Sequence, residues 1–546
     1  MSIKSNKKLL IPVILSLFVG IFFVACYPLS TGAIHWRIKF DKEKIAQKKA
    51  YLSDTILVNE KQPNIVLIVA DDLGLNDVSC YGNSTVQTPN IDALANEGVK
   101  CVEGYVTSAV CAPSRCGILT GRYQQRCGFE TQETEYYPTN IIEYLTGRYI
   151  SEKDTNWVVA TKPRYPREWQ IAKQGVPPTE ITLAELLKKA NYSTAIIGKW
   201  HLGKNPKFNI PSVRGFDYQY GCYGAFTMYV DNQIQEDIVN YRRQSFSAKY
   251  QWDMARRDDA MIYQNNKKIK HEKQYLTDAI RDRSIQFIEN NKQNPFFLYI
   301  PFTAPHEPYQ APLDLYVKEF EHVKDKKKAV YNAIIRSMDN AIGAIHQKIK
   351  DAGLDDNTLI IFLSDNGSAS YSGITSNEPL KGGKLTPYEG GLNIPFIFKW
   401  KNHLPENVVY RKPIISLDIF STVAAVSNIA LPKDRVYDGV NLMPFFKQEI
   451  DTAPHDKLYW RTDHVHAIRK GDYKLIYSTR DKWKELYNLK EDKGERNNLF
   501  FSMPEKAADL ENDLMEWEKT LPVKPMWPRI MDYRFMIDGK SYLFPA

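Results

Sequence analysis

The sequence predicts an α/β fold in which a mostly parallel central sheet is flanked by helices, with a smaller antiparallel-sheet subdomain at the C-terminal end. Two observations lead to this prediction. Short apolar runs alternate with amphipathic helical patterns over most of the chain, and from about Leu458 the hydrophobic period changes to two. At 546 residues the chain has room for two or three domains.

The strands of the main sheet are predicted from runs that are apolar at nearly every position. Such runs are typical of parallel strands that are buried on both faces. Turn residues and helical patterns separate them. The runs are Ile65–Ala70, Ala195–Gly198, Phe296–Ile300, Leu359–Leu363 and Pro395–Lys399.

Amphipathic helices are predicted between these runs. The first covers Asn90–Glu97, with Thr88 as its cap, Pro89 at its first position and Gly98 as its stop. The others show apolar residues at the three-and-four spacing of a buried helix face. They are Thr182–Ala190, Leu276–Asn290 and Ala329–Ala352.

The C-terminal part shows a different pattern. His466–Tyr477 and Glu485–Leu489 alternate apolar and polar residues around turn residues, which predicts a small antiparallel sheet. We therefore divide the chain into a catalytic domain over 60–440 and a C-terminal subdomain over 441–546.

The N-terminus has the features of an export signal. The apolar run Leu9–Ala25 follows a lysine-rich start and contains Pro12 and Gly20, and its 17 residues are slightly few for a membrane-spanning helix. The run ends at Phe23-Val-Ala-Cys26, which resembles a bacterial lipobox. We expect residues 1–25 to be a signal peptide and Cys26 to be lipidated, which would place the protein in the periplasm or at the cell surface on a membrane anchor. An uncleaved signal anchor is the alternative.

Charge and composition exclude few functions. The net charge is +8, and removal of a signal peptide with three lysines would leave 8 − 3 = +5. No Lys/Arg tract or aromatic-basic pattern indicates a nucleic-acid partner. Two long stretches, Thr131–Pro178 and Gly221–Lys273, follow no regular period and are rich in tyrosine. Their aromatic residues could form substrate-binding walls or pack on the surface of the core.

Polar residues follow four of the predicted strands. In an open parallel sheet the carboxyl ends of the strands share one edge, where ligands bind, so we expect these side chains to lie close together. They are Asp71 and Asp72, Lys199 and His201, His306, and Asp365 and Asn366.

Four of these residues could bind a metal ion. Asp71, Asp72, Asp365 and Asn366 offer three carboxylates and one amide oxygen. Oxygen donors suit a hard cation such as Ca²⁺ better than zinc.

The segment Cys111-Ala-Pro-Ser-Arg-Cys-Gly-Ile-Leu-Thr-Gly-Arg122 resembles the signature of the sulfatase family, Cys-x-Pro-x-Arg followed by Thr-Gly-Arg. The resemblance continues from Pro63 to Leu499 and implies an alkaline-phosphatase-type fold. Further blocks close to those of sulfatases are Gly198-Lys-Trp-His-Leu-Gly203, Ala304-Pro-His-Glu-Pro308, Ser364-Asp-Asn-Gly367 and Gly383-Lys-Leu-Thr-Pro-Tyr-Glu-Gly-Gly391.

The resemblance implies that Cys111 is oxidised to formylglycine by a separate maturation enzyme. The hydrated aldehyde would be the nucleophile, because one hydroxyl attacks sulfur and the other then expels sulfate. Asp71, Asp72, Asp365 and Asn366 would hold Ca²⁺ together with the group derived from Cys111.

The same resemblance implies roles for the cationic and imidazole side chains. Arg115 would steady the aldehyde hydrate and its contact with calcium. Lys199 and Lys384 would bind sulfate oxygens, and His201 would accept the proton that accompanies sulfate release. His306, with Lys384, would protonate the leaving alcohol. Lys381 is a competing candidate for the position assigned to Lys384, and the family's small hydroxyl contact to sulfate has no clear match.

The implied substrate is a sulfated carbohydrate, for which we expect galactose or galactosamine units. With Cys26 lipidated and Cys111 modified, five of the seven cysteines remain, so at least one thiol would be free or paired outside the chain.

Two other functions are compatible with the pattern. A phosphate or phosphonate ester hydrolase of the same superfamily is one, although such enzymes generally carry histidine where this chain has Asn366. The second is an inactive glycan-binding lipoprotein. The complete set of polar residues from Asp71 to Lys384 argues against it.

Overall fold

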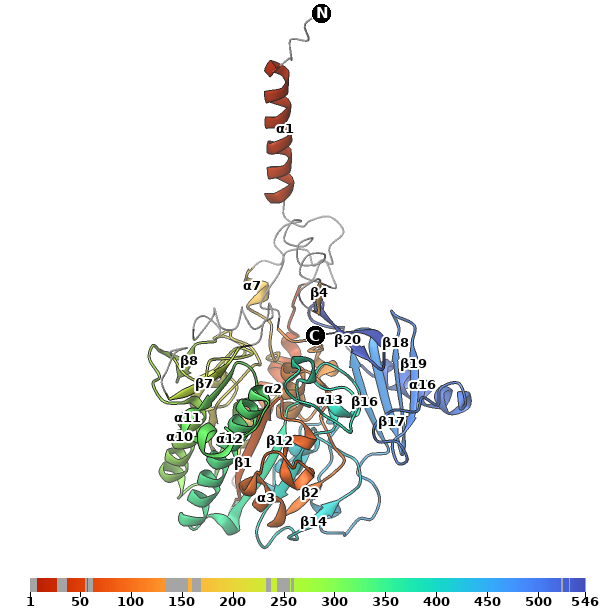
Figure 1. Ribbon diagram of the computed structural model, residues 1–546. Coiled ribbons are helices and arrows are strands. Elements are labelled where there is room, and N and C mark those ends of the chain that lie inside the picture. The colour runs from red at the N-terminus through yellow and green to blue at the C-terminus, as the bar shows by residue number, and fades with distance from the viewer. Residues whose placement is uncertain are drawn as a thin grey trace, which may run out of the picture.

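The computed structural model describes residues 7–26, 37–54, 56, 62–133, 156–159, 168–231, 237–242, 256, 260–521, 524–529 and 531–545. Its centre is a ten-stranded sheet in the order β14-β2-β13-β12-β1-β10-β5-β6-β8-β9, with helices on both faces (Figure 1). A four-stranded antiparallel sheet is built from C-terminal residues. The predicted fold class is confirmed.

Four of the predicted strands form the parallel centre of the sheet. β1 (Asn64–Asp71) lies between β10 (Phe296–Pro305) and β12 (Thr358–Ser364), and β5 (Ser193–Ile197) pairs with the other side of β10. All of these pairings are parallel. The carboxyl ends of the four strands therefore meet at one edge, as the sequence predicted.

The prediction for the fifth strand was wrong in its direction. β13 (Phe396–Lys399) pairs antiparallel to β12, with Ile360 opposite Lys399. A parallel neighbour requires a crossover of a dozen or more residues to the opposite edge, usually through a helix. Between β12 and β13 the chain contains only one short α-helix, α13 (Glu389–Leu392). The chain therefore re-enters the sheet from the edge at which β12 ends, and β13 runs antiparallel to β12.

Shorter strands complete the sheet and form two small pairs beside it. β6 continues the parallel centre, whereas β8 and β9 add antiparallel strands at one end, and β2 and β14 extend the other end. Their bounds are β6 Tyr218–Cys222, β8 Ile262–Gln264, β9 Lys267–Ile269, β2 Val99–Cys101 and β14 Val408–Tyr410; the two pairs are β7 Ile238–Tyr241 with β11 Tyr309–Pro312, and β3 Gly104–Tyr105 with β15 Ile414–Ile415.

Two hydrophobic cores lie on the two faces of the sheet. In β1, Val66 and Ile68 belong to one core, whereas Ile65 and Leu67 belong to the other, because successive strand residues point to opposite faces. The first core includes residues of α3 Pro89–Asn96, α10 Leu276–Asn291 and α12 Lys326–Asp351, and the second includes residues of α4 Cys111–Thr120, α8 Leu183–Lys188 and α14 Asp418–Val426.

The four predicted helices are confirmed, and Thr88 is the N-cap residue of α3 as predicted. Thr182 caps α8, accepting a hydrogen bond of 3.2 Å from the backbone N–H of Glu185. Thr88 makes no such capping bond to α3. Its hydroxyl instead donates to Asp92 at 3.2 Å and accepts from the backbone N–H of Ser79 at 3.0 Å. The other α-helices in the described part of the chain are α1 Lys7–Cys26, α2 Lys42–Ser53, α7 Glu168–Ile171, α11 Leu313–Glu319, α15 Met443–Phe446 and α16 Pro504–Lys519.

The predicted C-terminal antiparallel sheet is present. Four strands pair in chain order, and α16 packs against its two middle strands. A second antiparallel sheet, which the sequence did not predict, joins the C-terminal hairpin β20–β21 to β4, a strand from a distant part of the chain. The strands are β16 Lys457–Thr462, β17 Val465–Lys470, β18 Tyr473–Ser478, β19 Lys484–Asn488, β20 Met531–Ile537, β21 Lys540–Pro545 and β4 Trp157–Val159.

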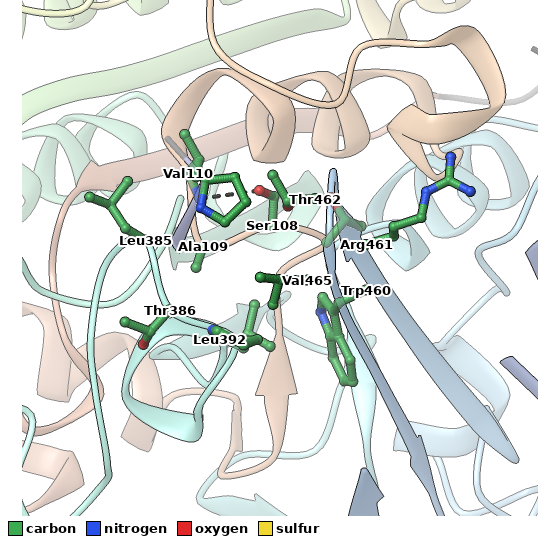
Figure 2. Close-up of a pocket in the computed structure, with 13 residues that line it drawn as sticks. Ser108, Ala109, Val110, Leu385, Thr386, Leu392, Trp460, Arg461, Thr462 and Val465 are labelled. Atoms are coloured by element: carbon green, nitrogen blue, oxygen red, sulfur yellow. Dashed lines mark hydrogen bonds between the residues drawn. The ribbon is translucent and has the colours of Figure 1, made fainter. Parts of the chain in front are cut away.

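The four-stranded sheet contacts the main body through Trp460. Its indole N–H donates to the backbone carbonyl of Val106 at 2.7 Å, and its ring lies 5.6 Å from that of Tyr105. Figure 2 shows Trp460 and Val465 facing Ser108–Val110 and Leu385 across a small cavity. The cavity holds about 30 Å³, which is room for about one water molecule, so this contact is an interface and not a ligand site.

Other sequence predictions lie partly outside the described residues. Within the two long aperiodic stretches the described parts contain α7, β4, β7, β8 and β9 and segments without regular structure, and residues 134–155, 160–167, 232–236, 243–255 and 257–259 are not described. Among the described residues, no helix is both long enough and apolar enough to span a membrane. The signal peptide, the lipidation of Cys26 and the domain boundaries stay predictions. The six cysteines whose side chains are described are free thiols.

We expect Trp460→Ala to lower the free energy of unfolding by about 3–5 kcal/mol, because it removes a buried ring and leaves the Val106 carbonyl unpaired. Urea denaturation followed by circular dichroism would measure this loss. Trp169→Ala is the control, because Trp169 is 45% exposed and should cost less than about 1 kcal/mol. Equal losses in the two variants would contradict a structural role for the interface.

Candidate active site

The polar residues at the four strand ends lie in one buried cluster. Asp71 ends β1 and Asp72 follows it, whereas the other members follow β5, β10 and β12 within a few residues, or lie on α4 or in the segment between β12 and β13. Every predicted site residue except His306 is at least nine-tenths buried. The site residues that the structure brings together are Asp71, Asp72, Cys111, Arg115, Lys199, His306, Asp365, Asn366 and Lys384.

Asp71 lies between two cations. Lys199 Nζ is 2.7 Å from Asp71 Oδ2, and Arg115 Nη2 is 3.4 Å from Asp71 Oδ1. Arg115 also donates through Nε to Asp365 Oδ2 at 2.8 Å, so it connects the ends of β1 and β12. Burial raises the pKa of Asp71, but the charges of Lys199, His306 and Arg115 together lower it by more, so the pKa is below its usual range and the carboxyl is ionised.

Lys199 reaches this position through a tight turn at Gly198. The φ of Gly198 is +141°, and a Cβ there would lie 1.9 Å from the carbonyl oxygen of Pro301. Only glycine fits this turn. The backbone N–H of Lys199 then donates to the Pro301 carbonyl at 2.7 Å, which fixes the end of β5 against β10.

Asp72 is the centre of a second group of contacts. Lys384 Nζ lies 2.8 Å from its Oδ2 and His306 Nε2 lies 3.6 Å from the same atom, while Asn366 Nδ2 donates to its Oδ1 at 2.8 Å. Burial raises the pKa of Asp72, but the charges of Lys384, His306 and Lys199 together outweigh that effect and lower it. Asp72, with φ of 63°, is in the left-handed region, where Leu385 next to Lys384 also lies at 75°. Such strain is common at functional sites.

Cys111 is the first residue of α4, and its Sγ lies 3.6 Å from Asp72 Oδ1. Its side chain thus lies at the positive end of a helix, where a developing negative charge is stabilised. Burial nevertheless raises the pKa of the Cys111 thiol well above its usual value. The unmodified thiol is therefore protonated and is a poor nucleophile.

His201 and His306 are both kept neutral. Burial, followed by the charge of Lys199, lowers the pKa of His201 well below its usual value, and its Nδ1 has no hydrogen-bond partner within the described part of the chain. Burial and the charge of Lys384 also lower the pKa of His306. A neutral imidazole accepts a proton and, once protonated, can donate it, so His201 is available as a base and His306 as an acid after it has taken up a proton.

The cluster has the features of a cation site. Ligand atoms of Asp71, Asp72, Cys111 and His306 all lie within 4.8 Å of one another. Asn366 Oδ1 is buried and has no hydrogen-bond partner among the described residues, which is costly unless a cation or a donor occupies the space beside it. The prediction did not include His306 among the ligands. It lies close to Asp72 because β10 extends to Pro305, five residues beyond the predicted end of that strand.

The competition between Lys381 and Lys384 is resolved by position. Lys381 Nζ lies 3.0 Å from Asp538 and donates to the Tyr487 hydroxyl at 3.1 Å, so it faces the C-terminal part of the chain. Of the two, Lys384 contacts the cluster, through Asp72.

Sequence reasoning missed the residues that support the site. The hydroxyl of Tyr229 donates to the backbone carbonyls of Thr303 and His306, at 2.9 and 3.1 Å, and so holds the His306 segment. Asn377 accepts hydrogen bonds from both the backbone N–H and the hydroxyl of Ser368, two residues after Asn366. Nothing in a local pattern indicates such contacts, because each depends on how distant segments pack.

Two family models match the chain. The model described as Sulfatase matches residues 63–429, and the model described as N-sulphoglucosamine sulphohydrolase, C-terminal, matches residues 383–520. Among characterised relatives, the N-acetylgalactosamine-6-sulfatase of Canis lupus familiaris is 32% identical over 431 residues, covering 78% of this chain and 73% of the relative. The enzyme of the same name from Homo sapiens is 32% identical over 421 residues, covering 76% and 72%.

Solved structures agree with the sequence relatives. The crystal structure of Ps i-CgsB superposes with a TM-score of 0.70 at 29% identity, covering 86% of this chain and 95% of that one, and it has also been solved in complex with k-i-k-neocarrahexaose. These matches, together with the buried Asp-Cys-Lys cluster at the strand ends, show that the chain belongs to the sulfatase family and is a sulfuric ester hydrolase.

Proposed function

We propose that this protein removes sulfate from a sulfated carbohydrate, with formylglycine formed from Cys111 as nucleophile and Ca²⁺ as metal ion. The observation that carries the proposal is the position of Cys111, at the N-terminus of α4 between the carboxylate of Asp72 and the ammonium groups of Lys199 and Lys384. The thiol is a poor nucleophile in this environment. A hydrated aldehyde at the same position supplies one hydroxyl to attack sulfur and a second whose deprotonation releases sulfate.

Calcium is supported by the donors of the cluster. Asp71, Asp72, Asp365 and Asn366 would hold it, with Asn366 Oδ1 as the oxygen that has no other partner in the described structure. Oxygen ligands of this kind suit Ca²⁺, and when bound it would polarise a sulfate oxygen and lower the pKa of a nucleophilic hydroxyl. Arg115 pairs with both Asp71 and Asp365 and so restrains the two carboxylates that would hold the ion.

The cations and histidines suit the proton and charge transfers of sulfate ester hydrolysis. Lys199 and Lys384 would bind sulfate oxygens, which is supported by the position of both ammonium groups at the cluster. His201, neutral and with an unpaired Nδ1, is suited to accept the proton of the second hydroxyl. His306 and Lys384 flank Asp72 and would protonate the departing alcohol.

A carbohydrate substrate is supported by the relatives. N-acetylgalactosamine-6-sulfatases at 32% identity are named for a sulfated amino sugar, and Ps i-CgsB has been solved in complex with the oligosaccharide k-i-k-neocarrahexaose. We extend this substrate class to the present chain.

We also propose that the protein is exported and lipidated at Cys26, on the basis of the apolar run and lipobox-like sequence at its N-terminus. A maturation enzyme would act on Cys111.

Formylglycine at position 111 can be tested directly. We expect peptide mass spectrometry of active protein to show Cys111 as the aldehyde or its hydrate, and Cys111→Ala to abolish sulfate release. Cys127→Ala is the control, because Cys127 is a nearby cysteine that lies after the end of α4 and not at its N-terminus. This variant should still release sulfate. Fully active protein with an unmodified Cys111 would refute the proposed mechanism.

Calcium binding can be tested through stability. We expect EDTA to lower the melting temperature and added Ca²⁺ to restore it, because a ligand at about 100 times its Kd stabilises the folded state by about 2.7 kcal/mol. Asn366→Leu should reduce this calcium-dependent shift. Asn294→Leu, at an exposed position, should retain it. An unchanged shift in the Asn366 variant would remove Asn366 from the ligand set.

The acid role of His306 predicts a dependence on the leaving group. His306→Ala should lower turnover of a sulfated sugar by about a hundredfold or more relative to turnover of nitrophenyl sulfate, because a sugar alkoxide needs protonation whereas an activated phenolate does not. Sulfate release from both substrates would be measured, with calcium content and Cys111 modification as controls. Equal losses on both substrates, in a variant that folds and binds calcium, would leave the acid role to Lys384.

A further inference from the structure

A cleft of about 520 Å³ lies beside the active site, between the segment Ser370–Gly382 and the C-terminal hairpin β20–β21. We call it the hairpin cleft. Its volume lies within the range of carbohydrate- and cofactor-sized sites. It is lined by uncharged polar, aromatic and charged side chains, among them Tyr371, Thr375, Ser376, Arg496, Tyr533 and Phe535.

One wall of the hairpin cleft is part of the active-site loop. Ser370–Gly382 connects Asn366 to Lys384, and Tyr371 is close enough to Lys384 to influence its pKa. The wall is held in place by Asn377, which donates to the backbone carbonyls of Ser368 and Gly382, both at 3.1 Å. A ligand in the cleft would therefore contact the segment that leads to Lys384.

The second wall is attached firmly to the first. The ring of Tyr371 lies 4.8 Å from that of Tyr533 on β20, and Lys381 Nζ lies 3.0 Å from Asp538 at the turn of the hairpin. These contacts fix the width of the cleft. A preformed site loses little entropy on binding.

The hairpin is the part of this site that the family models do not cover. The matched segments end at residue 520, whereas β20 begins at Met531. The cleft is therefore shaped by residues beyond the family's shared sequence. Residues outside the shared sequence of a family typically determine which substrate a member binds, whereas the shared residues carry out the reaction.

Arg496 gives the cleft its chemical preference. Its side chain is exposed, and its guanidinium makes no hydrogen bond or ion pair within the described residues, in contrast to the paired Lys381. A guanidinium binds sulfate and carboxylate groups through two parallel hydrogen bonds. The aromatic side chains of the walls offer apolar surface to a sugar ring.

From these observations we propose that the hairpin cleft binds the sugar unit next to the one that loses its sulfate, and that Arg496 pairs with an anionic group on that unit. This inference rests on the proposed action on sulfated carbohydrates. It predicts that the protein prefers an oligosaccharide with more than one anionic unit to a sulfated monosaccharide.

The test compares Arg496→Gln with the wild type on substrates of different length. The substrates are nitrophenyl sulfate, sulfated galactose and galactosamine monosaccharides, and position-defined hexasaccharides that include k-i-k-neocarrahexaose. Arg496→Gln should raise KM for the hexasaccharide that the wild type desulfates fastest, and lower the ratio of its kcat/KM to that for nitrophenyl sulfate about tenfold. Arg411→Gln is the matched control, an exposed arginine directly after β14, and should leave that ratio unchanged.

A binding measurement separates recognition from chemistry. In a Cys111→Ala background, which cannot turn over, the Arg496 variant should bind the same hexasaccharide about tenfold more weakly by calorimetry. An unchanged ratio, or a wild type that hydrolyses only nitrophenyl sulfate or monosaccharides, would overturn the cleft's role and leave the sulfatase activity intact. A matured wild type that releases sulfate from no substrate would instead refute the proposed function itself.

Discussion

The active site depends on the pairing of buried charges. Three carboxylates, Asp71, Asp72 and Asp365, are balanced by Arg115, Lys199 and Lys384 in a space that is almost closed to water. Removing one member of a buried pair typically costs about 3–5 kcal/mol, because the other charge is left unpaired. The pairing is possible only if strand ends and α4 are held in register. The two hydrophobic cores of the sheet therefore also determine the geometry of the charged cluster.

Much of the fold could be predicted from local patterns. A continuously apolar run is buried on both faces wherever it lies, so the four central strands and the main helices were identifiable. The direction of β13 was not, because an apolar run does not indicate from which edge the chain enters the sheet. The hairpin β20–β21 was missed for a related reason. It pairs with β4, more than 300 residues earlier, and such a distant partner leaves no periodic signal in either segment.

The residues at the centre of the candidate site could be predicted from the sequence, whereas the cleft beside it could not. Asp71, Asp72, Lys199 and Asp365 follow strands whose ends must meet in a parallel sheet, so their proximity could be inferred from the sequence. The hairpin cleft could not be inferred, because its walls come from an irregular segment and from the last strands of the chain. The residues of the cluster can be predicted because the topology of the sheet brings strand ends together. The residues around the cluster cannot, because their contacts exist only in the folded chain.

The interface at Trp460 has a consequence for the order of events during synthesis. The segment that precedes Cys111 rests on a strand 460 − 111 = 349 residues further along the chain. At roughly 5–20 residues per second, that strand is made roughly 20 to 70 seconds after Cys111. Until then the segment lacks its support. Since the folded protein exposes only 1% of Cys111, an enzyme that modifies its sulfur must act in this interval or on a chain that has not yet folded.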